Sequence, residues 1–499
     1  MIKVKTYRAL IALIASTILF TSCNKYLDEV PDNRVALNDL DKAAQLVTNA
    51  YTSASPAFTD WMSDDVTWTR GTTIRLAQRQ LYNWEDVTAD PTEPDTPIGY
   101  WFQTYDAIAH ANEVLAVIDN LPATSNEEVR RKRAIKGEAL LARAYGHFML
   151  VNLFGLHYNP QTSRSDRGVP YVTEPETTFL ATYDRESVSR VYDKVEDDLL
   201  EGLDLIDDSF FENSGKYHFN RNAALAFASR FYLFKRDFAR CEQYSTELLG
   251  SDPGAYVRDL TSPEFQAQKS SIQGYPRLYS SPDLPSNLLL IRKVSLIQRT
   301  DFAFGPESNF YGDLFSTRPF SGTTDERENP AFVKGDNALF PVRYESLFER
   351  SSLNSNSGFP YHIAIAFRGE EVLLNRAEVN AFQNRIDECI ADLQVLSNKR
   401  YSGTPPVLTM DLLRQFFGAQ NDPTFTDQLI LLNYIILERR KEFISQGMRW
   451  FDIKRFGIDV NHINESGNNI ETLFYDDPRL ALQIPTTAID VGGLEPNPR

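Results

Sequence analysis

Cysteine and histidine are scarce in this sequence, which holds three cysteines and six histidines in 499 residues. Beyond Cys23, only Cys241 and Cys389 remain, and two cysteines are too few for a disulfide-stabilised scaffold. The histidines show no HExxH pairing and the cysteines no CxxC spacing, so the sequence predicts no zinc site. It also lacks the GxSxG elbow, the phosphate loop and the GxGxxG turn. We therefore expect no metal, no cofactor and no catalytic constellation.

Basic residues are also fewer than acidic residues. Lys and Arg together number 51 against 68 Asp and Glu, which gives a formal net charge of −17 at pH 7. Such a surface repels phosphate backbones, so nucleic acid is excluded as a partner. With so many acids, carboxylate pairs arise by chance, and their spacing in the sequence does not indicate a glycosidase.

Long apolar runs are absent except at the N-terminus, where residues 9–20 carry no charge. Basic residues precede this run, and the small residues Thr21 and Ser22 lead from it into Cys23. The pattern is typical of a secretory signal, and the run is too short to span a bilayer. The segment resembles a bacterial lipobox, with Phe20 where leucine is usual. We expect cleavage before Cys23 and lipid attachment to its thiol; an ordinary signal peptide with a chance cysteine is the alternative.

Lipidation at this cysteine would divide the chain into a signal peptide (1–22), a lipidated tether (23–38) and one domain (39–499). Acyl chains rather than a helix would then anchor the protein at the outer membrane. Asp28 and Glu29 lie just beyond the lipid, and acids in this position favour the side that faces the cell exterior.

Helical periodicity dominates the rest of the chain. Apolar residues recur at three- and four-residue steps in the segments 100–121, 134–155, 187–208, 219–234, 237–250, 365–382 and 385–400. The last four segments form two hairpins, in which Ser229 and Ala377 each precede a cysteine by twelve positions. Small residues at such sites let paired helices approach closely, as in tetratricopeptide repeats. We predict a mostly α fold of tetratricopeptide-like helix pairs in a single domain, with Cys241 and Cys389 as compact core residues.

Two long segments interrupt this pattern, residues 55–98 and 251–360, and both are rich in turn-forming residues. Their many aromatic residues argue against disorder, and irregular segments of this length are usually functional. We therefore predict that they form a large loop-rich ligand-binding face.

The tryptophans indicate where on this face a ligand would bind. Flat aromatic rings stack on the apolar faces of sugar rings, while Asp, Asn and Arg bind hydroxyl groups. The candidate ligand-binding residues are Trp61, Asp64, Asp65, Trp68, Arg75, Tyr82, Asn83 and Trp84 in the first segment, and Tyr275, Tyr279, Phe310 and Tyr311 in the second. The alternative for each is a hydrophobic cluster that holds the loops down. Trp101 and Trp450 are expected in the core, and the charge-dense stretch 438–450 is expected to form a packed ion-pair network.

Several stretches, in this order along the chain, carry a family resemblance. They are CNKYLDEVPDN after the lipobox, YWFQTYDAIAHANEVL, GEALLARAYGHFMLVNLFG, NRNAALAFASRFYLFKRDFARC, FRGEEVLLNRAEVN, ERRKEFISQGMRWFDIKRFG and the ending RLALQIPTTAIDVGGLEPNPR. Together they resemble the SusD/RagB family of outer-membrane nutrient-binding lipoproteins. The TDER of residues 324–327 looks like a loose version of this family's short Asp-x-Arg element.

The resemblance implies a non-enzymatic protein whose irregular segments pack together as a ligand platform on a helical scaffold. It further implies a lid over a SusC-like TonB-dependent outer-membrane transporter, which captures a glycan or oligosaccharide and delivers it for import. A peptide ligand and a protein-interaction scaffold without transport remain alternatives. A surface glycosidase would need two carboxyl groups about 5 to 10 Å apart in a cleft beside the aromatics.

Overall fold

The structure is a computed structural model that describes residues 37–70, 74–176, 182–211, 215–297, 299, 303–334, 337–404, 406–420, 422, 424–465, 467 and 469–499. Cys23, the expected signal peptide and nearly all of the expected tether therefore lie outside the described residues. The part of the chain from Asp39 to Arg499 forms one unit.

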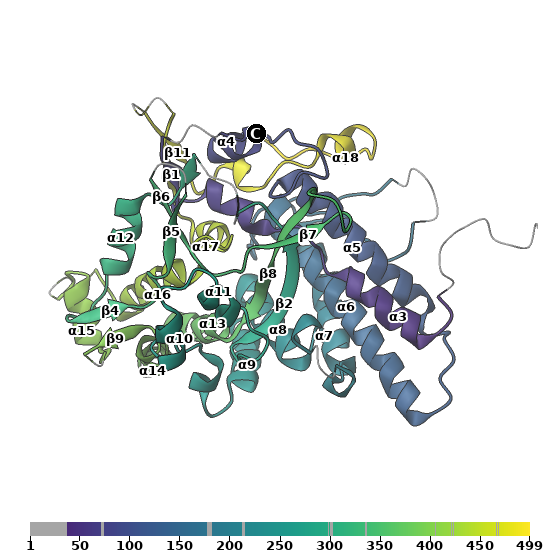
Figure 1. The fold of residues 1–499 in the computed structure, drawn as a ribbon, viewed down its shortest axis with the longest axis horizontal. Coiled ribbons are helices and arrows are strands. Elements are labelled where there is room, and N and C mark those ends of the chain that lie inside the picture. The colour runs from purple at the N-terminus through teal and green to yellow at the C-terminus, as the bar shows by residue number, and fades with distance from the viewer. Residues whose placement is uncertain are drawn as a thin grey trace, which may run out of the picture. The chain divides into compact units, whose positions relative to one another are not determined.

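Paired antiparallel helices make up the scaffold (Figure 1). These are α3 (Leu40–Val47), α5 (Pro97–Ile118), α6 (Asn126–Phe154), α7 (Val188–Leu205), α8 (Arg221–Lys235), α9 (Phe238–Leu249), α13 (Gly369–Phe382), α14 (Ile386–Asn398) and α16 (Asp427–Phe443). Each of α5 and α7 packs on α6, α8 packs on α9, and α13 packs on α9, α14 and α16. The predicted scaffold of helix pairs is confirmed. Within the part of the chain that the structure describes, no helix has both the length and the apolar character needed to cross a bilayer.

Small residues bring these helices together as expected. A Cβ added at Gly202 of α7 would lie 2.7 Å from the Leu141 side chain of α6, so only glycine permits this approach. In the next pair, the Ser229 hydroxyl of α8 lies 2.9 Å from that of Ser245 on α9. Cys241 and Cys389 are fully buried, and burial raises the pKa of the Cys241 thiol to about 12. Both therefore act as compact core residues rather than as reactive thiols.

Two helix starts differ from the sequence-based prediction. Helix α6 begins eight residues earlier than expected, where Ser125 and Glu128 form a reciprocal capping box. Its first two turns are charged and exposed, so they carry no apolar period, although the Ser-x-x-Glu cap marks the start. Residues 365–368 were predicted to be helical but belong to strand β8 (Gly358–Arg368), which runs directly into α13.

The two segments predicted to be irregular contain more regular structure than expected. Strands β2 (Asn287–Val294), β8 and β7 (Leu347–Arg350) form a three-stranded antiparallel sheet. Four two-stranded pairs accompany it: β1 (Thr67–Trp68) with β3 (Phe304–Gly305), β4 (Thr323–Asp325) with β9 (Tyr401–Gly403), β5 (Ala331–Lys334) with β6 (Ala338–Pro341), and β10 (Val460–Ile463) with β11 (Ile470–Leu473). Short helices complete the fold: α4 (Leu76–Tyr82), α10 (Pro263–Gln268), α11 (Gly274–Tyr279), α12 (Ser308–Ser316), α15 (Met410–Phe416), α17 (Arg449–Phe456) and α18 (Thr486–Asp490), with 3₁₀ turns at Thr48–Ala50, Pro56–Met62, Asp208–Phe210, Gly215–Tyr217, Pro253–Tyr256 and Pro478–Leu480.

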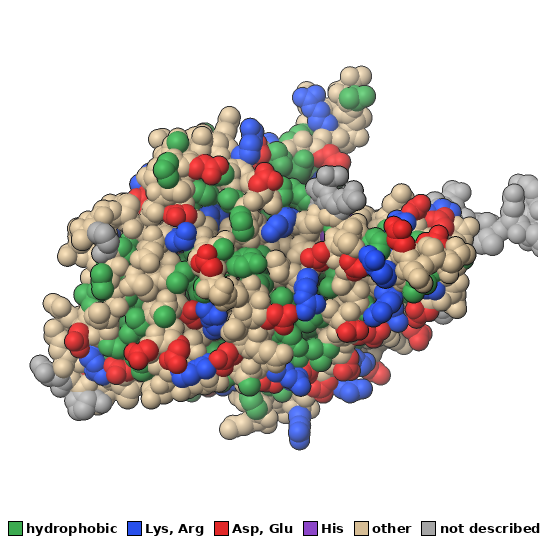
Figure 2. All heavy atoms as spheres, turned by 90° about the horizontal axis from the view of Figure 1, so that it is seen from below, with side chains coloured by type: hydrophobic (Ala, Val, Ile, Leu, Met, Phe, Trp, Pro, Cys, Tyr) green, Lys and Arg blue, Asp and Glu red, His purple; other side chains and the backbone are tan. Residues whose placement is uncertain are grey.

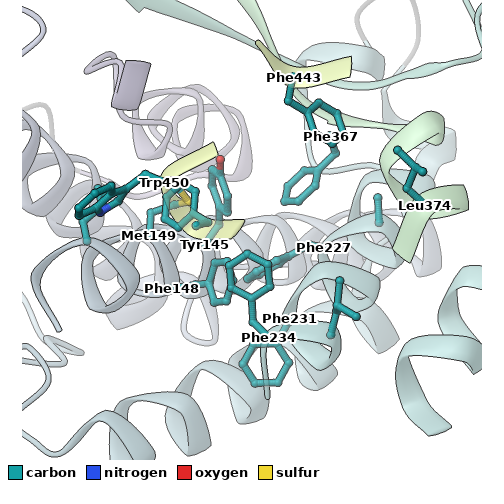
Figure 3. Packing of buried hydrophobic residues seen from close by; sticks show 14 of the residues in the cluster. Tyr145, Phe148, Met149, Phe227, Phe231, Phe234, Phe367, Leu374, Phe443 and Trp450 are labelled. Atoms are coloured by element: carbon teal, nitrogen blue, oxygen red, sulfur yellow. The ribbon is translucent and has the colours of Figure 1, made fainter. Parts of the chain in front are cut away.

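Aromatic rings fill the core where α6 meets α8 and β8 (Figure 3). Phe148 of α6 lies edge-on or tilted to Phe227 and Phe234 of α8, with ring centroids 5.5 and 5.4 Å apart. Tyr145 of α6 packs on Phe367 of β8 at 5.2 Å. Such geometries add about 0.5–1.5 kcal/mol per pair beyond the burial of apolar area. Trp101 and Trp450 are 4% and 0% exposed, so their predicted core positions are confirmed.

The net negative charge is not concentrated in one region of the visible surface. On the face that Figure 2 shows, acidic and basic side chains are interspersed and apolar side chains are scattered between them. Mixed charges of this kind keep a surface soluble without marking a charged binding patch.

A network of buried charges joins β4, β9 and α16. Asp325 accepts two hydrogen bonds from Arg327, at 2.8 and 2.7 Å. Arg327 also contacts Glu438 of α16 at 2.9 Å and the Tyr401 hydroxyl of β9 at 2.9 Å. Burial alone would raise the pKa of Asp325, but the charges of Arg327 and Lys441 and the hydrogen bonds from Arg327 together outweigh it and lower the pKa, so the carboxylate stays ionised. Lys441 lies 3.4 Å from the same carboxylate and adds the second positive charge.

A second part of the network extends to α13. Arg400 donates to both oxygens of Glu442, at 2.8 and 2.9 Å, and contacts Glu370 at 3.1 Å. Arg258 lies 3.1 Å from the same Glu370 oxygen. All four side chains are buried. The predicted packed ion-pair network in residues 438–450 is thereby confirmed, and the TDER element supplies its Asp325 and Arg327.

Replacing Arg327 should destabilise the fold strongly. Arg327→Ala leaves Asp325 and Glu438 buried without their main partner, and breaking a buried pair in this way costs about 3–5 kcal/mol. Arg277→Ala is the matched control, since Arg277 pairs with Glu345 on the surface, where its side chain is 71% exposed. Chemical denaturation should show a large loss for the first variant and almost none for the second. Equal losses would contradict a structural role for the buried network.

Candidate functional site

The two segments predicted to form the ligand-binding face do pack against each other. Strand β1 of the first segment pairs with β3 of the second. Beside this pair, the Thr69 amide and hydroxyl both donate to the Ala303 carbonyl, at 2.8 and 3.0 Å. Farther along, the Asp95 carboxylate accepts from the Ser295 hydroxyl at 2.6 Å and from the Leu296 amide at 2.7 Å. The segments therefore form one surface, held by hydrogen bonds at several points.

A stack of four rings occupies the interior of this surface. Tyr82 lies between Phe304 and His462, with ring centroids 4.3 and 4.1 Å apart, and Trp84 stacks on the other face of His462 at 4.4 Å. The Trp84 indole also donates to the Met62 carbonyl at 3.0 Å. Tyr82 is 0% exposed and Trp84 is 5% exposed. Contrary to the prediction, neither ring is free to stack on a sugar in this structure, because Phe304 and His462 cover the two faces of Tyr82 and Trp84 is buried against His462.

The acidic candidates are committed to ion pairs. Arg449 donates to both oxygens of Asp64 at 2.8 Å, and Arg440 contacts Asp65 at 2.5 Å. Burial alone would raise the pKa of Asp64, but hydrogen bonding from Arg449 lowers it, so this carboxylate is charged and paired. Trp61, beside them, is 3% exposed. These residues attach the first segment to α16 and α17 instead of facing a ligand.

The candidates in the second segment are also mostly internal. Tyr275, Tyr279 and Tyr311 are each at most 2% exposed, and the guanidinium of Arg258 lies 3.8 Å from the Tyr279 ring centroid. Phe310 is half-buried beneath Arg440. The three tyrosines therefore belong to the packing beneath the loops, whereas Phe310 keeps part of its ring accessible.

Besides the paired Asp64, three candidates from the first segment keep part of their surface accessible. Trp68, Arg75 and Asn83 are half-buried, and Arg75 contacts Glu93 at 2.7 Å. The structure thus places most of the candidates in the interior, in three separate hydrophobic clusters, with only a few at the surface.

A cleft on helix α5, here called the aromatic cleft, is a better candidate. It has a volume of about 400 Å³ and is lined by Trp101, Phe102, Tyr105, Asp106, Ala109, Pro170, Val172, Glu174, Glu176, Tyr183, Ala488, Gly492 and Leu494. Phe102 and Tyr183 are half-buried, so each ring presents an accessible surface. The Tyr183 hydroxyl donates to Glu176 at 2.8 Å. Flat rings beside carboxylate oxygens can bind the apolar faces and the hydroxyl groups of a sugar.

The wall of the aromatic cleft is held in place by His147 of α6. Its Nε2 accepts from the Val172 amide at 3.0 Å, and its Nδ1 lies 3.0 Å from the Arg143 carbonyl, to which it donates. This pattern requires the neutral imidazole, and burial lowers the pKa of His147 to about 3. Asn112 of α5 also donates to the Val172 carbonyl, at 3.1 Å. The wall is therefore formed before any ligand arrives.

A second hollow, here called the polar groove, lies along the neighbouring face of α5. It has a volume of about 610 Å³ and is lined by Thr48, Asn49, Tyr51, Thr52, Ser53, Gln103, Asp106, Ala107, His110, Tyr217, His218, Leu290, Ile291 and Arg292. Glu138 supports its floor by accepting from the Tyr51 hydroxyl at 2.6 Å and from His218 Nδ1 at 2.7 Å. Among the residues that the structure describes, no three His, Cys, Asp or Glu side chains group as metal ligands would.

Comparison with protein families decides the identity of this architecture. One family model, described as "Starch-binding associating with outer membrane", matches residues 25–233, and the SusD family model matches residues 350–490. The chain belongs to the SusD/RagB family.

Relatives of this SusD-family protein are distant in sequence but alike in fold. SusD-like protein P38 of Formosa agariphila is 21% identical over 405 residues, which cover 74% of this chain and 75% of that protein. A putative sugar-binding protein from Bacteroides vulgatus superposes with a TM-score of 0.67 at 18% identity, covering 93% of this chain and 99% of that one. A laminarin-binding SusD-like protein gives a TM-score of 0.57 at 18% identity, covering 92% and 99%.

The sequence does carry a signal for the aromatic cleft, although none of the candidate residues predicted from it lines this cleft. Residues 100–102 are three successive aromatic residues on α5. Successive helical positions turn by about 100°, so three neighbours cannot all face one core. Tyr100 and Trp101 are buried, and Phe102 is the ring left at the surface.

The ring stack predicts that Trp84 supports the SusD-family fold. Trp84→Ala removes a buried indole between His462 and the Met62 carbonyl, and such truncations cost about 3–5 kcal/mol. Tyr475→Ala is the control, because Tyr475 is 60% exposed. Thermal denaturation should show a clear loss only for Trp84→Ala. An unchanged melting temperature would make Trp84 a candidate ligand contact again.

Proposed function

We propose that this SusD-family protein binds a glycan at the cell surface, with the aromatic cleft as its principal contact site. The single observation that carries the proposal is the pairing of half-buried Phe102 and Tyr183 with carboxylates in a cleft of about 400 Å³. Pockets of about 300–1,000 Å³ with apolar walls and few polar groups are typical of small-ligand sites. Family membership supports a glycan, since one matching model is described as starch-binding and one structural neighbour binds laminarin.

Lipidation of Cys23 would hold the protein on the outer membrane and place the domain outside the cell. There it would act as a lid that passes its glycan to a SusC-like TonB-dependent transporter. The proposed role is binding without turnover. Trp68 and Arg75, half-exposed on the loop face, are proposed as additional contacts.

Glycan binding is tested by calorimetry on the full chain in detergent, against neutral and anionic oligosaccharides and peptide digests. Phe102→Ala and Tyr183→Ala should each raise Kd about tenfold, since losing one ring contact removes about 1–2 kcal/mol. Trp68→Ala reports on the loop face, and Tyr475→Ala is the matched exposed-aromatic control. Binding of peptides alone would overturn the choice of glycan. Release of reducing sugar from a bound glycan would overturn binding without turnover.

The lipid anchor has a separate test. Cys23→Ala should abolish incorporation of labelled palmitate and shift the protein from the membrane fraction to the soluble fraction, because no acyl chain remains. Cys241→Ala is the control and should leave both unchanged, since Cys241 is buried in the helical scaffold. If Cys23→Ala still carries label and sediments with outer membranes, the lipobox assignment is wrong.

A further inference from the structure

The aromatic cleft and the polar groove share one residue. Phe102, Asp106 and Ala109 of α5 line the cleft, while Gln103, Asp106 and His110 line the groove. The two hollows therefore lie on adjoining faces of the same helix, and Asp106 stands on the ridge between them. The Asp106 side chain is 78% exposed, and its contact with His110 is long, at 3.8 Å. The carboxylate oxygens of Asp106 are therefore open to a ligand.

The polar groove presents the chemistry that sugar hydroxyl groups require. Gln103 uses its carbonyl oxygen to accept from the Ser53 hydroxyl at 2.9 Å, which leaves its amide N–H groups for a ligand. Tyr217 is 40% exposed and offers both a ring face and a hydroxyl. Asn49 is exposed at the rim. The polar groove therefore offers hydrogen-bond donors, hydrogen-bond acceptors and an aromatic ring to a ligand.

The charges beside the ridge disfavour an anionic ligand. Among the described residues that line it, the aromatic cleft carries Asp106, Glu174 and Glu176 and no Lys or Arg. Arg292 is the one Lys or Arg among the described lining residues of the polar groove, and it lies over the Tyr361 ring and pairs with Glu349. The whole chain has a net charge of −17. Uronic acid or sulfate groups would meet repulsion from the three carboxylates of the aromatic cleft, one of which is Asp106 on the ridge.

We propose that the ligand is a neutral glycan chain of several sugar units that lies across α5. One end occupies the aromatic cleft, the chain passes Asp106, and the other end occupies the polar groove. A helix with its side chains is about 10–12 Å across, so a single sugar ring fills one hollow only. The inference rests on the proposed function, and it adds the ligand's class and length.

The first experiment measures affinity against chain length. Titration calorimetry on the full chain uses the di- to hexasaccharides of the neutral series that binds best among laminari-, malto-, xylo- and manno-oligosaccharides. Affinity should rise at least tenfold from the disaccharide to the hexasaccharide, because only the longer chain contacts both hollows. A galacturonate hexasaccharide should bind far more weakly. Equal affinity for all lengths, or a preference for the galacturonate, would overturn the inference and leave the proposed function standing.

Variants then locate the two ends. Tyr217→Ala and Gln103→Ala should raise Kd for the hexasaccharide about tenfold and leave the disaccharide unchanged, whereas Phe102→Ala should weaken both. Asp106→Asn keeps a hydrogen-bonding side chain and should bind the galacturonate better than the wild type does. Matching melting temperatures identify folded variants, and Tyr475→Ala is the control. Unchanged hexasaccharide binding by both groove variants would refute the second subsite. Failure of every glycan to bind wild type would refute the proposed function itself.

Discussion

Arg327 and its partners connect parts of this protein that are remote in sequence. The guanidinium contacts Asp325, Tyr401 and Glu438, so β4, β9 and α16 meet at one buried point. A buried charge is tolerated only when its partners surround it, and removing one partner leaves the others costly to bury. The irregular chain between residues 251 and 360 is therefore anchored to the helical scaffold where the network lies, which limits how the loops above it can pack.

The irregular segment 55–98 is also held in place by partners that are remote in sequence. Asp64 pairs with Arg449, and the rings of Tyr82, His462 and Trp84 stack across chain segments that lie far apart in sequence. These contacts use the aromatic and acidic groups that would otherwise face a ligand. Two accessible hollows lie on α5, and beside one of them Phe102 and Tyr183 remain half-exposed next to a wall fixed by His147. The residues that stabilise the loop face therefore differ from those that line the proposed binding site on α5.

Much of the fold was predictable from local pattern. Apolar period located the scaffold helices except α3 and α16, and small residues located the close helix contacts at positions such as Ser229. The charge-dense stretch 438–450 was correctly expected to pack as ion pairs. The start of α6 was missed because its first turns lack an apolar face, and residues 365–368 were misassigned because four apolar or mixed residues fit a strand as well as a helix. The residues of the proposed binding site were less predictable, since Phe102 differs from its aromatic neighbours only in the direction it faces.

The sequence by itself determined the helical class, the buried cysteines and the family, and it alone predicts the export signal. Each of these depends on residues close together in the chain or on a pattern that runs along it. Tertiary structure alone decided which aromatic rings and carboxylates face solvent. Asp64 is hydrogen-bonded by Arg449, which lies 385 residues farther along the chain. The Tyr82 carbonyl is in contact with His462, which lies 380 residues farther along. Exposure depends on such distant neighbours, because a side chain is buried by whatever packs over it and not by the residues beside it in sequence.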